Sequence, residues 1–182
     1  MSVLRRAFLA VVPPPDAVDA IDGLFDRAGR SKFRWTRRDQ WHVTVQYFGK
    51  VGSADDLIGA LAGPLAKVAS PAVQISSAGG FPSARRAAVF WLGVRDPVPL
   101  RSVHDVLIEA ASGFLRARDV IPYVPHLTLA RLDPPKRITT EVDALADVRL
   151  GGAWTAEELV LMESETHHSG SIYRTIARLP LG

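Results

Sequence analysis

Two segments 84 residues apart carry the pattern His-x-Thr within a short apolar run, and this pair constrains the fold more than any other feature. They are Trp41-His42-Val43-Thr44-Val45-Gln46-Tyr47-Phe48-Gly49 and Pro125-His126-Leu127-Thr128-Leu129-Ala130-Arg131. Side chains alternate between the two faces of a strand. Each segment therefore predicts a strand that presents an imidazole and a hydroxyl on one face and buries apolar residues on the other.

The same order of elements is predicted around each of the two His-x-Thr segments: strand, helix, His-x-Thr strand, helix, strand. In the first half the pattern indicates strands over 7–12, 41–48 and 73–77 and helices over 16–28 and 53–68. In the second half it indicates strands over 87–94 and 123–132, helices over 100–116 and 139–146, and a final strand pair over 158–162 and 172–179. If a pseudo-two-fold axis relates the halves, the two His-x-Thr strands lie side by side and face one cleft.

Composition narrows the class of protein. The chain has no cysteine, which excludes disulfides, a thiolate nucleophile and a zinc site built on sulfur. Lys and Arg outnumber Asp and Glu by only 22 to 19, so overall charge alone does not indicate a nucleic-acid binder. No apolar run approaches the roughly 20 residues of a membrane span. We expect one domain over residues 1–182, a cytoplasmic location, no membrane partner and a monomer.

Paired imidazoles suit proton transfer at a phosphoester. Imidazole titrates near neutral pH, so one ring can accept a proton from water while the other donates one to a leaving oxygen. The hydroxyls of Thr44 and Thr128 can donate hydrogen bonds to phosphate oxygens that gain charge in the transition state. This chemistry requires no metal and no cofactor, and we predict neither.

The chain resembles the two-histidine (2H) phosphoesterases, and among them the RNA 2′,3′-cyclic phosphodiesterases historically called 2′-5′ RNA ligases. The resemblance includes Arg6 to Val11, both His-x-Thr motifs, Gly80-Phe81-Pro82 with Val89 to Val94, Leu159 to Ser164 and Tyr173. The string Pro-His-Leu-Thr-Leu-Ala-Arg that starts at Pro125 is its most specific element. In the first motif Val43 and Val45 stand where leucines are commoner in the family.

The resemblance implies a bilobal α+β fold: two pseudo-symmetric lobes, each with an antiparallel sheet and flanking helices, with the active-site groove between them. It implies hydrolysis of an RNA 2′,3′-cyclic phosphate end to a 2′-phosphate. His42 would protonate the departing 3′-oxygen, and His126 would activate water. Thr44, Thr128 and Arg131 would hold the phosphate, although strict alternation from His126 would turn Arg131 away from the histidine face.

Further residues are candidates for RNA contact. Tyr47, Phe48 and Tyr123 could line a base pocket, and the basic connector that contains Arg34, Trp35, Arg37 and Arg38 could stack on bases and pair with phosphates. His104 is expected to be exposed on its helix.

Other functions remain open on the residues alone. The chain could act on a nucleotide or ADP-ribose cyclic phosphate, or cleave or form a 2′-5′ linkage, because the same two histidines would serve each reaction. It could also be a metallohydrolase that uses His42, His126 and the loop histidines His167 and His168, or a non-catalytic RNA-binding module.

Overall fold

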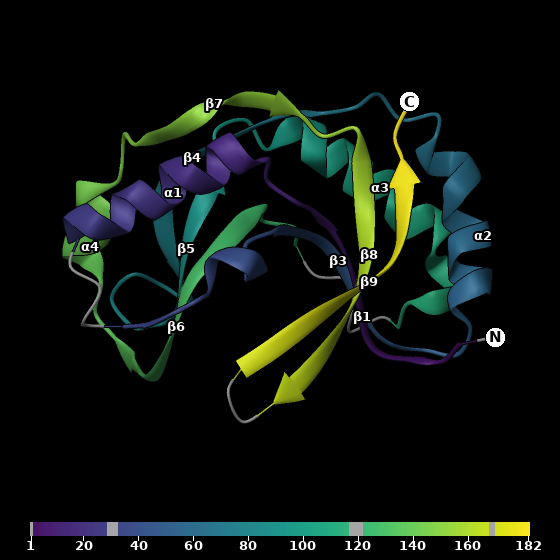
Figure 1. Cartoon of the computed structure of the whole chain (residues 1–182), viewed down its shortest axis with the longest axis horizontal. Helices are drawn as coiled ribbons and strands as arrows, with labels where there is room; N and C mark the ends of the chain where they lie inside the picture. Colours follow the sequence, from purple (N-terminus) through teal and green to yellow (C-terminus); the bar gives the residue numbers. More distant parts are fainter. Residues whose placement is uncertain (1, 29–32, 117–121, 168–169) are drawn as a thin grey trace.

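The computed structural model describes residues 2–28, 33–116, 122–167 and 170–182 (Figure 1). The strands are β1 (Leu4–Val11), β2 (Arg34–Trp35), β3 (Val43–Val51), β4 (Ala72–Phe81), β5 (Ala87–Val94), β6 (His126–Lys136), β7 (Arg149–Thr155), β8 (Glu158–His167) and β9 (Gly170–Pro180). The α-helices are α1 (Pro15–Ala28), α2 (Ala54–Leu65), α3 (Val98–Ala110) and α4 (Thr139–Ala144). Short 3-10 helices span Arg38–Gln40 and Ser112–Phe114.

Over the described residues, the strands form one antiparallel sheet in the order β7-β4-β5-β6-β3-β1-β8-β9, with β2 paired to β6. The two central strands, β3 and β6, are the His-x-Thr strands. They are joined at a single residue pair, Val43 with Leu127, and both of these side chains are fully buried. The sheet therefore consists of two groups of strands, β7-β4-β5-β6 with β2 and β3-β1-β8-β9, that separate on either side of this pair.

The predicted repeat of element order is confirmed. The first half reads β1, α1, β3, α2, β4, and the second reads β5, α3, β6, α4, β7. The α+β architecture with antiparallel strands and flanking helices is confirmed as well. The resemblance implies two separate sheets, but in the structure the pairing of Val43 with Leu127 joins them into one sheet.

Two strands were not predicted. β2 lies in the basic connector. β7 contains Gly151 and Gly152, which are typical of a turn, but here Gly151 has φ +66° inside the strand, and the β4–β7 pairing shifts register nearby. An ideal Cβ at Gly151 would lie 3.3 Å from the Cα of Ala17, so a glycine also allows α1 to approach this strand.

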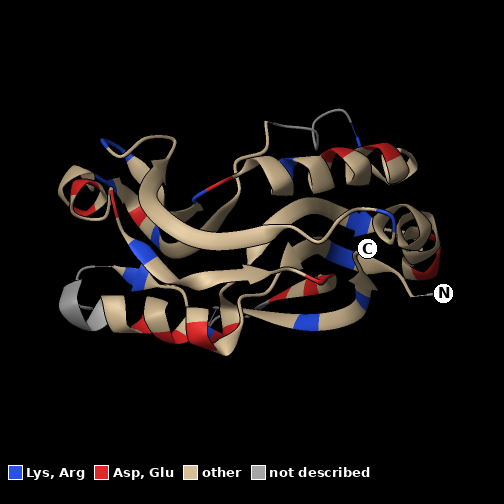
Figure 2. Cartoon of the chain, turned by 90° about the horizontal axis from the view of Figure 1, so that it is seen from above, with Lys and Arg blue, Asp and Glu red and all other residues tan. Residues whose placement is uncertain are grey.

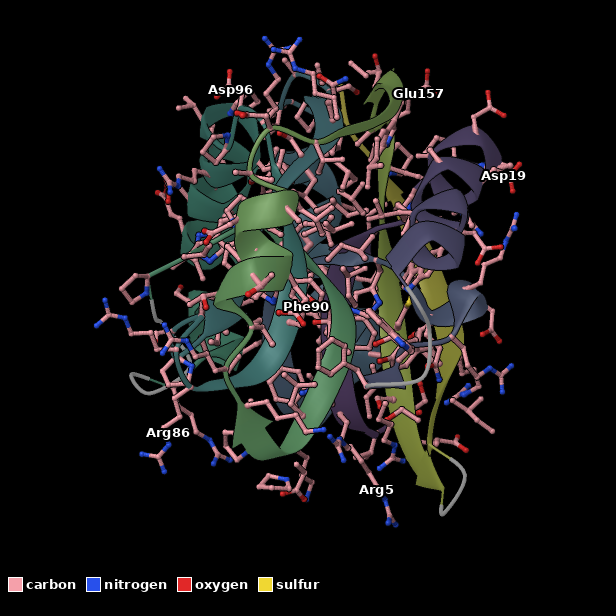
Figure 3. All side chains as sticks on the ribbon, turned by 90° about the vertical axis from the view of Figure 1, so that its left-hand side faces the viewer. Arg5, Asp19, Arg86, Phe90, Asp96 and Glu157 are labelled. Carbon is pink, nitrogen blue, oxygen red and sulfur yellow. The ribbon has the colours of Figure 1, made fainter. Side chains whose placement is uncertain are left out.

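The helices cover the two groups of strands separately. α1 packs on β7 and α4 on β4, while α2 packs on α3 and β9, and α3 packs on β3, as Figure 1 shows. The interior is apolar: Phe90 is buried at the centre of Figure 3, whereas the labelled side chains of Arg5, Asp19, Arg86 and Asp96 extend outward. Both histidine strands are thus anchored in the core by their alternate residues.

In the part of the chain that the structure describes, no helix has both the length and the apolar character needed to cross a membrane.

Candidate active site

His42 stands immediately before β3, and its ring is oriented by the main chain. Its Nδ1–H donates a hydrogen bond of 2.7 Å to the carbonyl oxygen of Gln40. When the ring is neutral, a proton held at Nδ1 leaves Nε2 as the acceptor nitrogen. The Gln40 side chain also donates to the carbonyl of Ser171 at the start of β9, so Gln40 connects His42 to the β8–β9 hairpin.

His126, the first residue of β6, has the same arrangement. Its Nδ1–H donates to the carbonyl oxygen of Val124 at 2.7 Å, again two residues earlier in the chain. Both rings therefore have the same tautomer and the same available nitrogen, Nε2. Two equivalent imidazoles that differ only in protonation can exchange the donor and acceptor roles of acid–base catalysis.

Aromatic rings enclose each imidazole. The ring centroid of His42 lies 4.9 Å from that of Phe8 and 5.1 Å from that of Tyr173, the latter edge to face. The centroid of His126 lies 4.9 Å from Phe81 and 6.0 Å from Trp91. These contacts restrict ring rotation and exclude water from one side of each ring.

Gly79 makes room for Trp91. An ideal Cβ at Gly79 would lie 2.2 Å from Cζ2 of the Trp91 ring, a distance that real atoms do not adopt. The absence of a side chain at this position therefore allows the indole to lie across β4 and contact His126.

Both histidines line one groove of about 310 Å³. Its lining residues are Arg34, Trp35, Thr36, Gln40, His42, Thr44, His126, Thr128, Arg131, Ser171 and Tyr173. The structure thus brings together all five residues predicted for catalysis and phosphate binding, with Arg34 and Trp35 beside them.

A β-bulge explains why Arg131 faces the groove. Along β5 and β6, Phe90 pairs with Ala130, but the next residue, Trp91, pairs with Thr128, which leaves Leu129 as an extra residue. Leu129 and Ala130 are both fully buried, so the alternation reverses after them and Arg131 returns to the histidine side. The conflict with strict alternation is resolved by this bulge.

Burial controls the protonation of the imidazoles. It is the main cause that lowers the pKa of His42 from 6.5 to about 4; the hydrogen bond to Gln40 opposes it, and the charges of His126 and Arg131 reinforce it. The pKa of His126 is lowered mainly by burial too, with Arg131 adding to the effect and the bond to Val124 opposing it. Both rings are therefore neutral at pH 7 when no anion is bound.

The three residues predicted for a base pocket have two different outcomes. Tyr47 and Tyr123 line a second hollow that adjoins the groove. Phe48 does not: it is only 3% exposed and belongs to the hydrophobic core, so the prediction of a base contact there is wrong. The cause is another bulge, earlier in β3: Leu9 pairs with Gln46 but Ala10 with Thr44, so Val45 is an extra residue, the alternation reverses after it, and Phe48 turns into the core.

The expectation for His104 is also wrong, because this side chain is 7% exposed. Its Nε2–H donates a 3.2 Å hydrogen bond to the side-chain oxygen of Gln46, and its ring stacks on Tyr123 with ring centroids 4.5 Å apart. Its position four residues after Leu100 and three before Leu107 on a helix placed it on the apolar face, a signal available from the sequence.

The arginines of the basic connector lie in two different environments. Arg37 pairs with Asp39, and Arg38 pairs with Asp19 of α1, the lower helix in Figure 2 that carries red along its length. Arg34 instead lines the groove. The basic connector therefore contributes Arg34 and Trp35 to the site, while Arg37 and Arg38 form ion pairs with acidic neighbours.

Several site residues were not identified by pattern reasoning. Gln40 and Phe8 lie outside the His-x-Thr motifs, and Trp91 reaches His126 from a neighbouring strand. Only the sheet topology places them beside the imidazoles. Among the described residues no group of three or more His, Asp or Glu side chains converges as a metal site. His168 lies outside the described residues.

A site of this construction, with two His-x-Thr strands facing one groove, defines a two-histidine phosphoesterase. The family model for the 2′-5′ RNA ligase superfamily matches residues 13–168, and the chain belongs to this superfamily.

Two relatives match along nearly the whole chain. An RNA 2′,3′-cyclic phosphodiesterase of Methanothermobacter thermautotrophicus is 29% identical over 92% of this chain and 94% of its own length. A protein of the same name from Geobacillus stearothermophilus is 27% identical over 96% of this chain, which spans only 56% of that longer protein.

Solved structures share the fold. The protein TT0787 of Thermus thermophilus superimposes with a TM-score of 0.79 at 23% identity and covers 97% of both chains. LigT of E. coli in complex with ATP superimposes with a TM-score of 0.72 at 23% identity and covers 98% of both chains.

Proposed function

We propose that this protein hydrolyses RNA 2′,3′-cyclic phosphate ends to 2′-phosphates by acid–base catalysis between His42 and His126. The observation that carries the proposal is the matched orientation of the two imidazoles: each is fixed through Nδ1 to a main-chain carbonyl, and both line one groove. The names of the two relatives, RNA 2′,3′-cyclic phosphodiesterases, support the substrate class.

The proposed reaction is a direct displacement at phosphorus. Nε2 of His126 accepts a proton from water as the water oxygen bonds to phosphorus. The bond from phosphorus to O3′ breaks, and O3′ takes a proton from Nε2 of His42, which gives a 3′-hydroxyl and a 2′-phosphate. Each transfer of this kind contributes roughly 10²- to 10⁴-fold to the rate.

Three side chains are assigned to the phosphate. Thr44 and Thr128 lie two residues after the histidines on the same strand faces, where their hydroxyls can donate to the non-bridging oxygens. Arg131 presents a planar fork that can donate two parallel hydrogen bonds to phosphate. Because all these groups come from one chain, the proposal includes a monomeric enzyme, which light scattering can check.

The test is hydrolysis of a short RNA with a 2′,3′-cyclic phosphate in the presence of EDTA. We expect the wild type to yield a 2′-phosphate and His42→Ala and His126→Ala to lose activity by several orders of magnitude. Val98→Ala, at an exposed position on α3, serves as the matched control and should retain full activity. A wild-type enzyme that requires the chelated metal, or that turns over no cyclic phosphate, contradicts the proposal.

A further inference from the structure

A second hollow of about 400 Å³ continues the catalytic groove beyond His126. The two share Thr44 and His126 as lining residues, so they are the two ends of one cleft along β3 and β6. The described residues of the second hollow include Tyr47, Phe81, His104 and Tyr123. A group bound here would be within reach of a phosphate held between the histidines.

The internal repeat shows how the two ends correspond. On β1 and β3, Leu9 pairs with Gln46 but Ala10 with Thr44, which leaves Val45 as an extra residue. Val45 is three residues after His42, just as the extra residue of β6, Leu129, is three residues after His126. The bulge reverses the alternation on both strands, so Tyr47 occupies on β3 the position that Arg131 occupies on β6.

The two ends differ in charge. The catalytic groove contains the guanidinium groups of Arg34 and Arg131, which suit phosphate. No Lys, Arg, Asp or Glu is among the described residues that line the second hollow. Its single imidazole beyond His126, that of His104, is neutral at pH 7 because burial lowers its pKa. This end therefore suits an uncharged group.

Aromatic rings make up much of the lining of the second hollow. Tyr47 lines the hollow and is 46% exposed, so its ring is accessible to a bound group. His104 and Tyr123, which also line the hollow, form a stacked pair with an interplanar angle of 14°.

Polar atoms occur at defined points in this lining. The Gln46 side chain accepts a hydrogen bond from His104 and donates one to the Tyr47 carbonyl at 2.7 Å, so it links His104 to the main chain of β3. The buried Tyr123 hydroxyl has no hydrogen-bond partner among the described residues.

We propose that this hollow is a nucleobase subsite, which holds an uncharged base of the RNA while the cyclic phosphate lies between the histidines. The inference rests on the proposed function for the identity of the substrate. Aromatic rings bind bases by stacking, and pockets of a few hundred Å³ with few polar groups suit a ligand of this size. The base can belong to the terminal nucleoside or to its neighbour, and the substrates below separate these sources.

The test compares kcat/KM of the wild type, Tyr47→Ala, Tyr47→Phe and the exposed control Val98→Ala on three substrates. These are methyl riboside 2′,3′-cyclic phosphate, which has no base, a nucleoside 2′,3′-cyclic phosphate, and a dinucleotide that ends in the cyclic phosphate. Removal of a stacking ring should lower kcat/KM by about 5- to 100-fold wherever a base occupies the hollow. Tyr47→Phe, which keeps the ring, and Val98→Ala should change it little.

A decrease with the nucleoside but not the base-free substrate assigns the hollow to the terminal base. A decrease only with the dinucleotide assigns it to the neighbouring base. Equal decreases on all three substrates, or none, overturn the proposal. If the wild type hydrolyses no substrate, the proposed function fails, and the subsite is tested separately by titration with adenosine and cytidine. Shifts of the ring NMR signals of Tyr47 and His104 then support the nucleobase subsite. Unmoved signals overturn it.

Discussion

Substrate binding should draw a proton onto His42. Burial lowers the pKa of this imidazole to about 4, so only about 0.1% of the free protein carries the proton there at pH 7. The proposed role of His42 as proton donor requires the charged form. A cyclic phosphate is a monoanion that cannot supply the proton itself, so solvent must provide it when the substrate binds.

The magnitude follows from electrostatics. An anion about 4 Å from the imidazolium in a partly solvated site, with an effective dielectric constant of about 20, stabilises the charge by about 4 kcal/mol. This corresponds to a factor of about 10³ in the protonation constant of His42. The protonated fraction in the complex then becomes about one half at pH 7 and about nine tenths at pH 6.

The assay is calorimetry with His126→Asn, which should bind the cyclic phosphate without hydrolysing it. Titrations in two buffers of different ionisation enthalpy give the number of protons taken up, which we expect to be about 0.5 at pH 7 and about 0.9 at pH 6. Affinity should rise about tenfold from pH 8 to pH 6, because proton uptake favours binding at lower pH.

The control is the double variant that carries both His126→Asn and His42→Asn, which should take up no proton when it binds the cyclic phosphate. Uptake that persists in the double variant would show that another group carries the proton. If no uptake accompanies binding at either pH, His42 is not the acid and the assignment of roles is refuted.

Three further predictions follow from the same geometry. Arg131→Lys should lower kcat/KM by about tenfold or more, because a lysine cannot reproduce the two parallel hydrogen bonds of the guanidinium. Gly79→Ala should lower both kcat and Tm, because the new Cβ would displace the Trp91 ring that contacts His126. Stability should decrease as pH falls from about 6.5 towards 4, because the unfolded chain binds a proton at His42 more readily than the folded one; urea unfolding at several pH values measures this.

Each of these has a direct check. For Arg131→Lys, unchanged kinetics would reject a phosphate role. For the glycine, Gly59→Ala on α2 is the matched control, because no atom lies within 4 Å of its added Cβ; an equal loss in both variants would contradict the steric argument. For the pH effect, His42→Asn should flatten the dependence of stability on pH, and an unaltered slope would mean that other groups cause it.

The sequence was sufficient to predict the parts of the site that depend on periodicity. Alternation within the His-x-Thr segments placed His42 and Thr44 on one face, and the repeated order of elements predicted that β3 and β6 are neighbours. Both conclusions rest on local patterns that a strand or helix must satisfy in order to bury its apolar residues. The pairing of Val43 with Leu127 confirms the second.

The bulges could not be predicted in the same way. Val45, Phe48 and Leu129 are apolar β-formers, and nothing in their chemistry distinguishes an extra residue from a regular one. Only pairing with the partner strand determines which of them is extra. For this reason the direction of Arg131 remained in conflict with alternation, and Phe48 was predicted in the wrong environment.

The junction of β3 and β6 at one residue pair has a consequence for how the enzyme loses activity. Main-chain hydrogen bonds connect the strands within each group, whereas one residue pair joins β3 to β6 across the junction. Apolar residues of both groups pack into one core, so the chain should unfold globally as one cooperative unit. Each group carries one imidazole, so a local opening at the junction separates the pair, and heat inactivation should precede global unfolding.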